Sequence, residues 1–224
     1  LARALAQWSD GTLFWTTMTF AFQPAGVAAI FEGAPPGHAQ AFAEDRARMR
    51  IGAPRLPVAG ATVQLRNALG WLETQLQGRS YLLGTKTPSL ADFAVQHPMW
   101  FLRRIEPLAK AFGATPSVLA WLERMAAVKE GAPAFEKMSS GAAIELAASS
   151  EPQPIEPAPA VDLFKAKLGQ RVTVTPIDYA FDPVEGELLQ ASASRVSLRR
   201  TDSRAGTVHV HFPRNGLEIK PIAP

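Results

Sequence analysis

A proline-rich segment at residues 149–160 divides the chain into two parts with different hydrophobic periods. Its run SSEPQPIEPAPA holds four prolines in twelve residues. Proline fixes φ and lacks a backbone donor, so this run favours an extended, semi-rigid linker over a helix or a central strand. Apolar residues repeat with a helical period before the segment and with a period of two after it. We therefore predict a helical domain over 1–148 and a small β domain over 161–224.

The first part has the spacing of an all-α bundle. Apolar residues share one helical face over Leu1–Phe22, which predicts the first helix. Turn signals interrupt residues 23–60, where we expect only a short exposed helix over 39–50. Helical spacing returns over 61–77 and predicts a long buried helix.

Ser89 and Asp92 form a Ser-x-x-Asp capping box that predicts the start of the next helix. The serine hydroxyl and the aspartate carboxylate can each accept a hydrogen bond from the other residue's backbone N–H. We expect a kink at Pro98 inside this helix. Thr115-Pro116 predicts a further helix with threonine as its cap, and a weaker one is expected over 132–148.

The second part has the pattern of a small antiparallel sheet or barrel. Short runs alternate between apolar and polar residues and are separated by Asp-Pro, Asp-to-Gly and Asn-Gly turn signals. Five strands are predicted, around Val172/Val174, Val184 to Leu188, Val196/Leu198, Val208 to Phe212 and Leu217/Ile219.

Composition excludes several classes of function. The chain has no cysteine, which excludes disulfides, thiolate nucleophiles and cysteine-ligated zinc. Its net charge of +3 is spread along the sequence, so we expect no nucleic-acid partner. No apolar run is long enough to span a membrane and no signal peptide is visible, so we expect a cytoplasmic protein with no membrane partner. The chain opens inside a predicted helix without a methionine, so we expect the native protein to begin further upstream.

The segment around Ser89 carries a family resemblance. Residues 80–84, Ser-Tyr-Leu-Leu-Gly, and 88–93, Pro-Ser-Leu-Ala-Asp-Phe, are similar to the "L-x-G... S-x-A-D" signature of glutathione transferase C-terminal domains. Leu5–Asp10 resembles the start of the family's fourth helix, and 119–125 resembles its seventh. The resemblance covers residues 1–148 and does not include the β domain.

The resemblance implies a dimeric enzyme whose thioredoxin-like domain precedes these helices. In the family that domain binds glutathione as co-substrate and stabilises its thiolate. This chain has no such domain, so we expect it to lack most of the glutathione site and to hold no catalytic residue. The full-length homodimer is expected to conjugate glutathione to a small hydrophobic electrophile.

The resemblance also implies two kinds of site residue. Phe14, Thr17 and Met18 share one helix face, which in the family lines the pocket for the electrophile, and Trp100 is a further candidate. The alternative is that these residues belong to the core. Asp10 corresponds to a position that binds the ammonium group of the partner subunit's glutathione, and the alternative is a solvated or dimer-interface acid.

Other polar groups favour a structural interpretation. Ser89 and Asp92 could be a hydroxyl–carboxylate catalytic pair, but their spacing favours a helix cap. His209 and His211 lie on one strand face and could begin a metal site, yet no third ligand is apparent, so no metal is predicted. The arginines near residue 200 could bind phosphate, or form a solvated strand end, which is the reading their acidic neighbours favour.

A second functional hypothesis is a non-catalytic binding or scaffold protein. In it the helical part would serve as a dimer platform and the β domain would recognise a partner. The proline-rich segment and the added β domain motivate this alternative.

Overall fold

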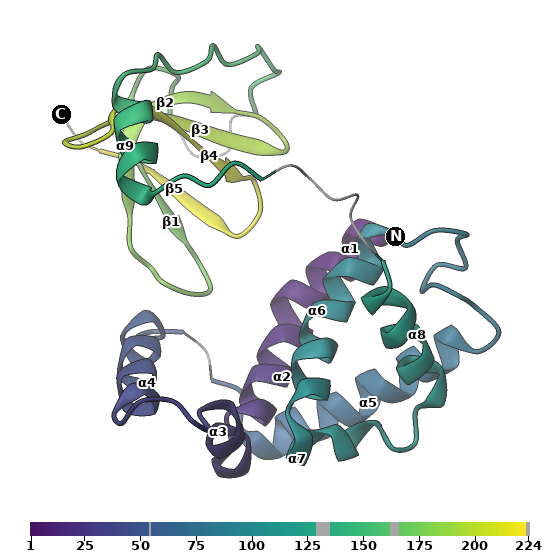
Figure 1. The fold of residues 1–224 in the computed structure, drawn as a ribbon. Coiled ribbons are helices and arrows are strands. Elements are labelled where there is room, and N and C mark those ends of the chain that lie inside the picture. The colour runs from purple at the N-terminus through teal and green to yellow at the C-terminus, as the bar shows by residue number, and fades with distance from the viewer. Residues whose placement is uncertain (54, 129–134, 162–165, 223–224) are drawn as a thin grey trace. The chain divides into compact units, whose positions relative to one another are not determined.

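The computed structural model describes residues 1–53, 55–128, 135–161 and 166–222. By its contacts the chain divides into two compact units. The first consists of Leu1–Ala43 and Arg55–Pro133, and the second of Glu44–Pro54 and Ala134–Pro224. Figure 1 shows the helices of the first unit and the five-stranded sheet of the second.

Every regular element described in the first unit is a helix. The chain opens with α1 (Ala2–Trp8), a π-helical turn (Ser9–Leu13) and α2 (Phe14–Ala21), which follow one another without a break. The further helices are α3 (Pro24–Ile30), α4 (His38–Met49), α5 (Val58–Leu76), α6 (Leu90–Arg104), α7 (Glu106–Ala109), a 3-10 turn (Lys110–Phe112) and α8 (Pro116–Ala126). The helix α4 starts in this unit and ends in the other.

The core of the helical unit lies where α2, α5, α6 and α8 meet. The helix α6 packs against α1, α2 and α8, and α5 packs against α2 and α8. Fully or almost fully buried side chains from these helices and their connections fill the centre, among them Leu13, Leu65, Leu76, Leu82, Val95, Met99, Leu102, Phe112, Val118 and Trp121. Burial of these apolar side chains is the main force that holds the helices together.

Asp92 is the polar centre of this core, with 0% of its surface exposed. The predicted capping box is present at the start of α6. Asp92 Oδ2 accepts from the Ser89 N–H at 2.8 Å and from the Ser89 hydroxyl at 2.7 Å. Its Oδ1 accepts from the Leu82 N–H at 2.8 Å and from the Trp121 indole N–H at 3.1 Å. One carboxylate therefore joins the loop before α6, the start of α6 and the middle of α8.

The start of α8 is capped from another helix. Thr115 occupies the cap position, but its hydroxyl donates to the Phe112 carbonyl at 2.9 Å and makes no capping hydrogen bond. The predicted position of Thr115 at the start of α8 is therefore confirmed, but the prediction that its side chain caps the helix was wrong. The Glu73 carboxylate on α5 accepts instead from the N–H groups of Ser117 at 3.1 Å and Val118 at 3.0 Å.

Glu73→Gln is expected to lower the free energy of unfolding by about 0.5–1 kcal/mol at pH 7, a modest value because the site is partly solvated. Burial raises the pKa of Glu73, but hydrogen bonds from the Ser117 side chain and from the Val118 and Ser117 N–H groups outweigh it, so the pKa is lowered. A lowered pKa gives stability that is full above the unfolded-state pKa and is lost as the pH falls through the folded-state value.

Urea unfolding of wild type and Glu73→Gln at pH 7 and pH 3 checks this expectation. The difference between the two proteins should be present at pH 7 and should shrink as the pH falls through the folded-state pKa of Glu73. A difference that grows on acidification would contradict the capping role of Glu73.

The second unit contains α9 and an antiparallel sheet in the strand order β4-β3-β2-β1-β5. The elements are α9 (Ser140–Ala148), β1 (Arg171–Pro176), β2 (Val184–Ala191), β3 (Arg195–Asp202), β4 (Gly206–Pro213) and β5 (Leu217–Pro221). One face of the sheet carries a small core of Val172, Val174, Leu188, Val196, Leu198 and Ile219. The predicted antiparallel sheet of five strands is confirmed.

The proline-rich segment lies against this sheet. The Gln153 carbonyl is 3.1 Å from His209 Nδ1 on β4, and the Glu156 carbonyl accepts from the Gln190 amide at 3.0 Å. The Val161 N–H donates to the Ala191 carbonyl at 2.8 Å. The helix α9, just before this segment, packs on β4. Contacts therefore group α9 and the segment with the sheet, and the domain boundaries at 148 and 160 stay predictions.

The structure differs from the predicted helices at several places. The last predicted helix begins at Ser140, where Ser139 Oγ accepts from the Ala142 N–H at 3.1 Å, while residues 132–134 lie outside the described residues. The region predicted as irregular after residue 22 contains the helix α3, which starts with Pro24 in its first turn. Pro98 lies inside α6, and the helix continues through it.

Candidate functional site

The π-helical turn Ser9–Leu13 contains Asp10, the predicted contact to glutathione. Its first residue, Ser9, is buried, and the Ser9 hydroxyl donates to the Ala94 carbonyl on α6 at 2.9 Å. This contact fixes the turn against the central helix. A π turn inserts one residue into a helix and changes the direction of the side chains around it, a device that is frequent at functional sites.

Asp10 is the second residue of this turn and is exposed to solvent. Among the residues that the structure describes, none forms a salt bridge with its carboxylate. The carboxylate is thus available to a cation from outside the chain. Its role in binding the ammonium group of glutathione stays a prediction.

The three predicted pocket residues of α2 differ in exposure. Phe14 and Met18 are half-buried, and the Phe14 ring packs edge-on against Trp15 with the ring centroids 5.2 Å apart. Thr17 is fully buried, and its hydroxyl donates to the Phe14 carbonyl at 2.8 Å. In this structure Thr17 packs inside the unit, whereas Phe14 and Met18 retain surface for a ligand.

The outer face of α6 carries an apolar stripe, which sequence reasoning did not identify as a whole. Leu90, Phe93, His97, Trp100 and Arg104 follow spacings of three and four, which place them on one helix face, and all five are exposed. The exposed fractions of Leu90, Phe93 and Trp100 are 54%, 50% and 39%. The Arg104 guanidinium lies over the Trp100 ring, 4.5 Å from its centroid. We call these five residues the α6 stripe.

The predicted candidate Trp100 therefore belongs to this stripe. Large apolar side chains in contiguous exposed positions are uncommon on soluble proteins and mark surfaces that bind other molecules. The signal was present in the sequence as the spacing of Leu90, Phe93 and Trp100. It was missed because the same spacing also describes a buried helix face.

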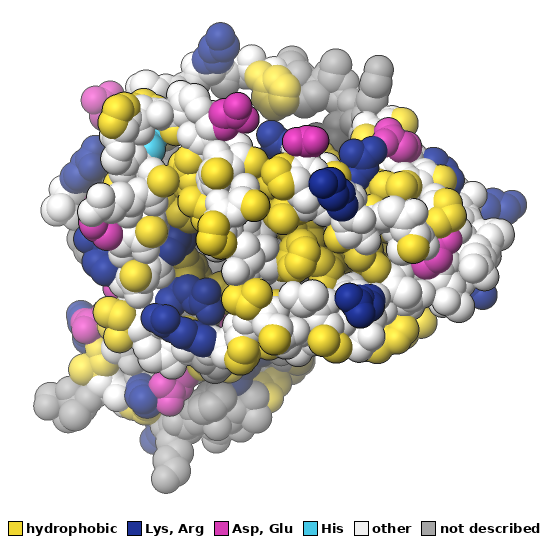
Figure 2. Space-filling model, turned by 90° about the horizontal axis from the view of Figure 1, so that it is seen from below, with side chains coloured by type: hydrophobic (Ala, Val, Ile, Leu, Met, Phe, Trp, Pro, Cys, Tyr) yellow, Lys and Arg dark blue, Asp and Glu magenta, His cyan; other side chains and the backbone are white. Residues whose placement is uncertain are grey.

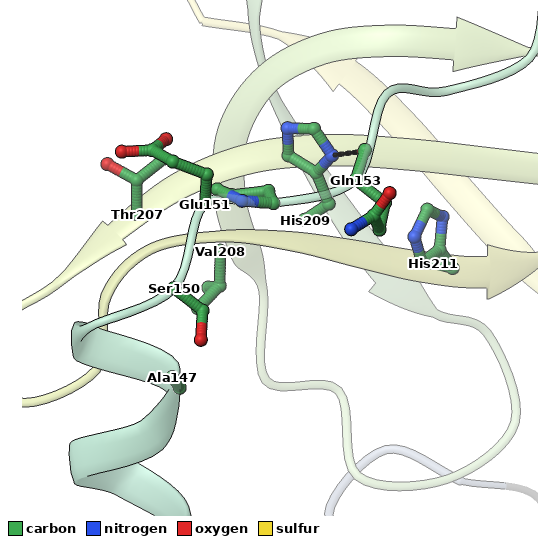
Figure 3. A pocket seen from close by; sticks show the side chains of 9 residues that line it. Ala147, Ser150, Glu151, Gln153, Thr207, Val208, His209 and His211 are labelled. Atoms are coloured by element: carbon green, nitrogen blue, oxygen red, sulfur yellow. Dashed lines mark hydrogen bonds between the residues drawn. The ribbon is translucent and has the colours of Figure 1, made fainter.

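The two histidines of β4 line a hollow of the second unit, drawn in Figure 3. His209 contacts the Gln153 carbonyl, and His211 Nδ1 lies 2.9 Å from the Ser197 hydroxyl. Their rings are perpendicular, with centroids 6.4 Å apart. Among the described residues, no three histidine, cysteine, aspartate or glutamate side chains lie where they could hold one metal ion.

Acidic side chains lie beside the arginines around residue 200. Arg199 pairs with Glu187 at 3.1 Å on the neighbouring strand. Asp202 closes the following turn by accepting from the N–H groups of Arg204 and Ala205 at 2.9 and 3.0 Å. On the face drawn in Figure 2, Lys and Arg side chains lie among acidic and hydrophobic ones.

Within the described residues, no helix combines the length and the apolar character that crossing a membrane requires.

Comparisons with known proteins agree with this geometry. Residues 39–124 match the glutathione S-transferase C-terminal domain family. A solved structure of a GST-like protein from Pseudomonas syringae is 31% identical, with a TM-score of 0.74, over 99% of this chain and 67% of that one. The β-etherase LigF from Sphingobium sp. strain SYK-6 is 20% identical over 57% of each chain, with a TM-score of 0.39. No curated protein matches the sequence.

The match to the Pseudomonas syringae protein includes the second unit, because it covers 99% of this chain. Helices followed by a small sheet are thus shared with that GST-like protein.

Proposed function

This chain belongs to the glutathione S-transferase family, and from that premise we propose that it is the acceptor-binding part of a glutathione transferase. In its full-length form the protein conjugates glutathione to a small hydrophobic electrophile. The match to a GST-like protein over 99% of the chain is the observation that carries this proposal. In the proposed reaction the glutathione thiolate attacks an electrophilic carbon, a C–S bond forms and the leaving group departs with its electron pair.

In that reaction the residues of this chain bind and position the electrophile. Phe14 and Met18 present half-buried apolar surface to the electrophile, which is held mainly by removing apolar area from water. Trp100 adds an exposed aromatic face. Thr17 supports the helix turn beneath Phe14 through its hydrogen bond. The group that lowers the thiol pKa belongs to a thioredoxin-like domain outside this chain.

Leu90 and Phe93, in the first half of the α6 stripe, form the surface proposed to contact that domain, and Trp100 stays open to the electrophile. Their large apolar side chains are exposed in this unit, and covering them would remove apolar area from water. A cytoplasmic homodimer, in which Asp10 reaches the partner subunit's glutathione, completes the proposal.

Glutathione-affinity chromatography of the full-length protein and a turnover assay with 1-chloro-2,4-dinitrobenzene test this function. Retention on the resin and release of chloride with formation of the thioether are the expected results. A folded full-length protein that is neither retained nor active would remove the proposal.

Asp10→Asn in the full-length protein is expected to raise KM for glutathione about tenfold, because a charge-assisted hydrogen bond to the ammonium group is lost. The kcat should change little, since Asp10 does not touch the reacting sulfur. Steady-state kinetics with varied glutathione measure both quantities. Asp182→Asn, at another exposed aspartate, is the control. An unchanged KM in Asp10→Asn would assign the carboxylate to solvent or to a subunit interface.

The alternative is a non-catalytic binding or scaffold protein. The hydrogen-bonded packing of residues 153–161 on the sheet favours it, because the second unit is an ordered body with a hollow of its own. The two functions differ in one result. A scaffold would fold and dimerise without binding glutathione, whereas the proposed transferase must bind it.

A further inference from the structure

A hollow of about 270 Å³ lies in the second unit, where the end of α9 meets β4. Ala147 on α9 and Val208 on β4 give it apolar lining, and residues 150–153, which follow α9, also line it. A space of this size suits a ligand of a few heavy atoms. The described residues that line it all belong to the second unit, whereas the proposed transferase residues belong to the helical one.

The charge of the hollow comes from Glu151, the one acidic or basic side chain apart from histidine among its described lining residues. The Glu151 side chain is exposed and forms no salt bridge or hydrogen bond with any described residue. Arg199, which lies opposite His209 in the sheet register, is paired with Glu187 at 3.1 Å. The hollow also lies at the C-terminal end of α9, where a helix carries partial negative charge. Both features favour a cation.

The His209 ring presents a hydrogen-bond acceptor. The Gln153 carbonyl, 3.1 Å from Nδ1, can only accept a hydrogen bond, so Nδ1 carries the proton of the neutral ring and Nε2 the lone pair. The His211 ring has the same tautomer. The Ser197 hydroxyl donates to Gln190 Oε1 at 3.3 Å and therefore accepts from His211 Nδ1 at 2.9 Å. Nε2 of each ring has no partner among the described residues.

Thr207 adds a hydroxyl acceptor. It lies two residues before His209 on β4, so the two side chains share one face of the strand. Figure 3 shows Glu151 and Thr207 on one side of His209 and His211 on the other. A carboxylate, an imidazole nitrogen and a hydroxyl thus line one hollow, and they match the three N–H donors of a primary ammonium group. A metal ion fits less well, because no three described histidine, cysteine, aspartate or glutamate side chains lie where they could hold one.

We propose that this hollow binds a small primary amine in its protonated form. The ammonium group donates to the Glu151 carboxylate, to His209 Nε2 and to the Thr207 hydroxyl. The short apolar chain of the amine lies against Val208 and Ala147. This binding goes beyond the proposed conjugation reaction and does not depend on it, since it uses residues of the second unit alone.

NMR titration of butan-1-amine into this chain at about pH 8 tests the proposal, with butan-1-ol as the neutral analogue. At this pH the amine is protonated and an ordinary histidine is neutral. The ring C–H signals of the four histidines give the readout. Those of His209 should shift to saturation with a Kd on the order of 1 mM, and those of His38 and His97 should not move. Butan-1-ol should bind at least about threefold more weakly, because it lacks the charge that pairs with Glu151.

Two variants remove single acceptors from the hollow. Glu151→Gln should weaken the amine at least about threefold and leave butan-1-ol unchanged. Thr207→Val keeps the branched shape without the hydroxyl and should weaken the amine about twofold or more. Glu156→Gln is the matched control, because it makes the same charge change at an exposed residue of the same proline-rich segment outside the hollow, and it should change neither ligand.

Three results would overturn the proposal. The first is the absence of any saturable shift at His209 in the millimolar range. The second is equal affinity of wild type and Glu151→Gln for the amine, or equal affinity of wild type for the amine and the alcohol. The third is a saturable Zn²⁺ site at His209 and His211 in a chain that does not bind the amine, which would assign the hollow to a metal ion.

Discussion

Replacing Asp92 by alanine is expected to lower the free energy of unfolding of the helical unit by about 4 kcal/mol. The carboxylate is fully buried and accepts hydrogen bonds from Ser89, Leu82 and Trp121. Alanine leaves these donors buried without an acceptor, and each unsatisfied donor carries a desolvation cost. Urea unfolding followed by tryptophan fluorescence measures the change.

Two further variants separate the two roles of Asp92, capping α6 and accepting hydrogen bonds from Leu82 and Trp121. Ser89→Ala removes one hydroxyl at the helix start and should cost only about 1 kcal/mol. Trp121→Phe keeps a large aromatic ring but removes the indole donor, and its effect should also be smaller than that of Asp92→Ala. Equal losses in Ser89→Ala and Asp92→Ala would show that Asp92 acts only as a helix cap.

Gly26→Ala is expected to destabilise the helical unit by about 3 kcal/mol. Gly26 lies in α3 and is buried. An added Cβ would clash with the carbonyl oxygen of Ala21, the last residue of α2, and would lie 3.2 Å from Leu108 Cδ1. The backbone oxygen cannot move without shifting the end of α2. Thermal and urea unfolding of the variant check the prediction.

Gly70→Ala is the matched control for Gly26→Ala. Both glycines lie inside helices, but an added Cβ at Gly70 would meet nothing within 4 Å. The substitution should raise stability by up to about 1 kcal/mol through helix propensity alone. If both variants lose stability equally, the close approach of α2 and α3 is not what requires glycine at position 26.

Local sequence signals predicted most of the elements. The Ser89 capping box marked the start of α6, and alternation of apolar and polar residues marked all five strands, because both patterns report on groups within a few residues of each other. The helix α3 was missed because its short sequence has no apolar period, although Pro24 in its first turn was a start signal.

Contacts between distant residues could not be predicted in this way. Glu73 caps α8 although it lies 44 residues before Ser117 in the chain. The Trp121 indole on α8 donates a hydrogen bond to Asp92 on α6. Neither pairing leaves a local pattern. The proline-rich segment was predicted to be a linker. Its hydrogen bonds to the sheet involve Gln190 and His209, and the composition of the segment does not reveal these partners.

The candidate site was predictable only in part. Spacing placed Phe14, Thr17 and Met18 on one face, but helical spacing does not tell buried residues from exposed ones, and Thr17 is buried. The π-helical turn that carries Asp10 leaves no signature in the sequence. Of the α6 stripe only Trp100 was predicted, because helical spacing does not show which face of α6 is exposed.

Titration of glutathione into the full-length protein and into residues 1–224, in parallel calorimetric experiments, tests the central claim most directly. The full-length protein should bind glutathione at one site per subunit. Residues 1–224 should give no saturable heat, because they hold only the outer contact at Asp10. Saturable binding by residues 1–224 alone, or none by either protein while both are folded, would contradict the assignment of this chain to the acceptor side of a transferase.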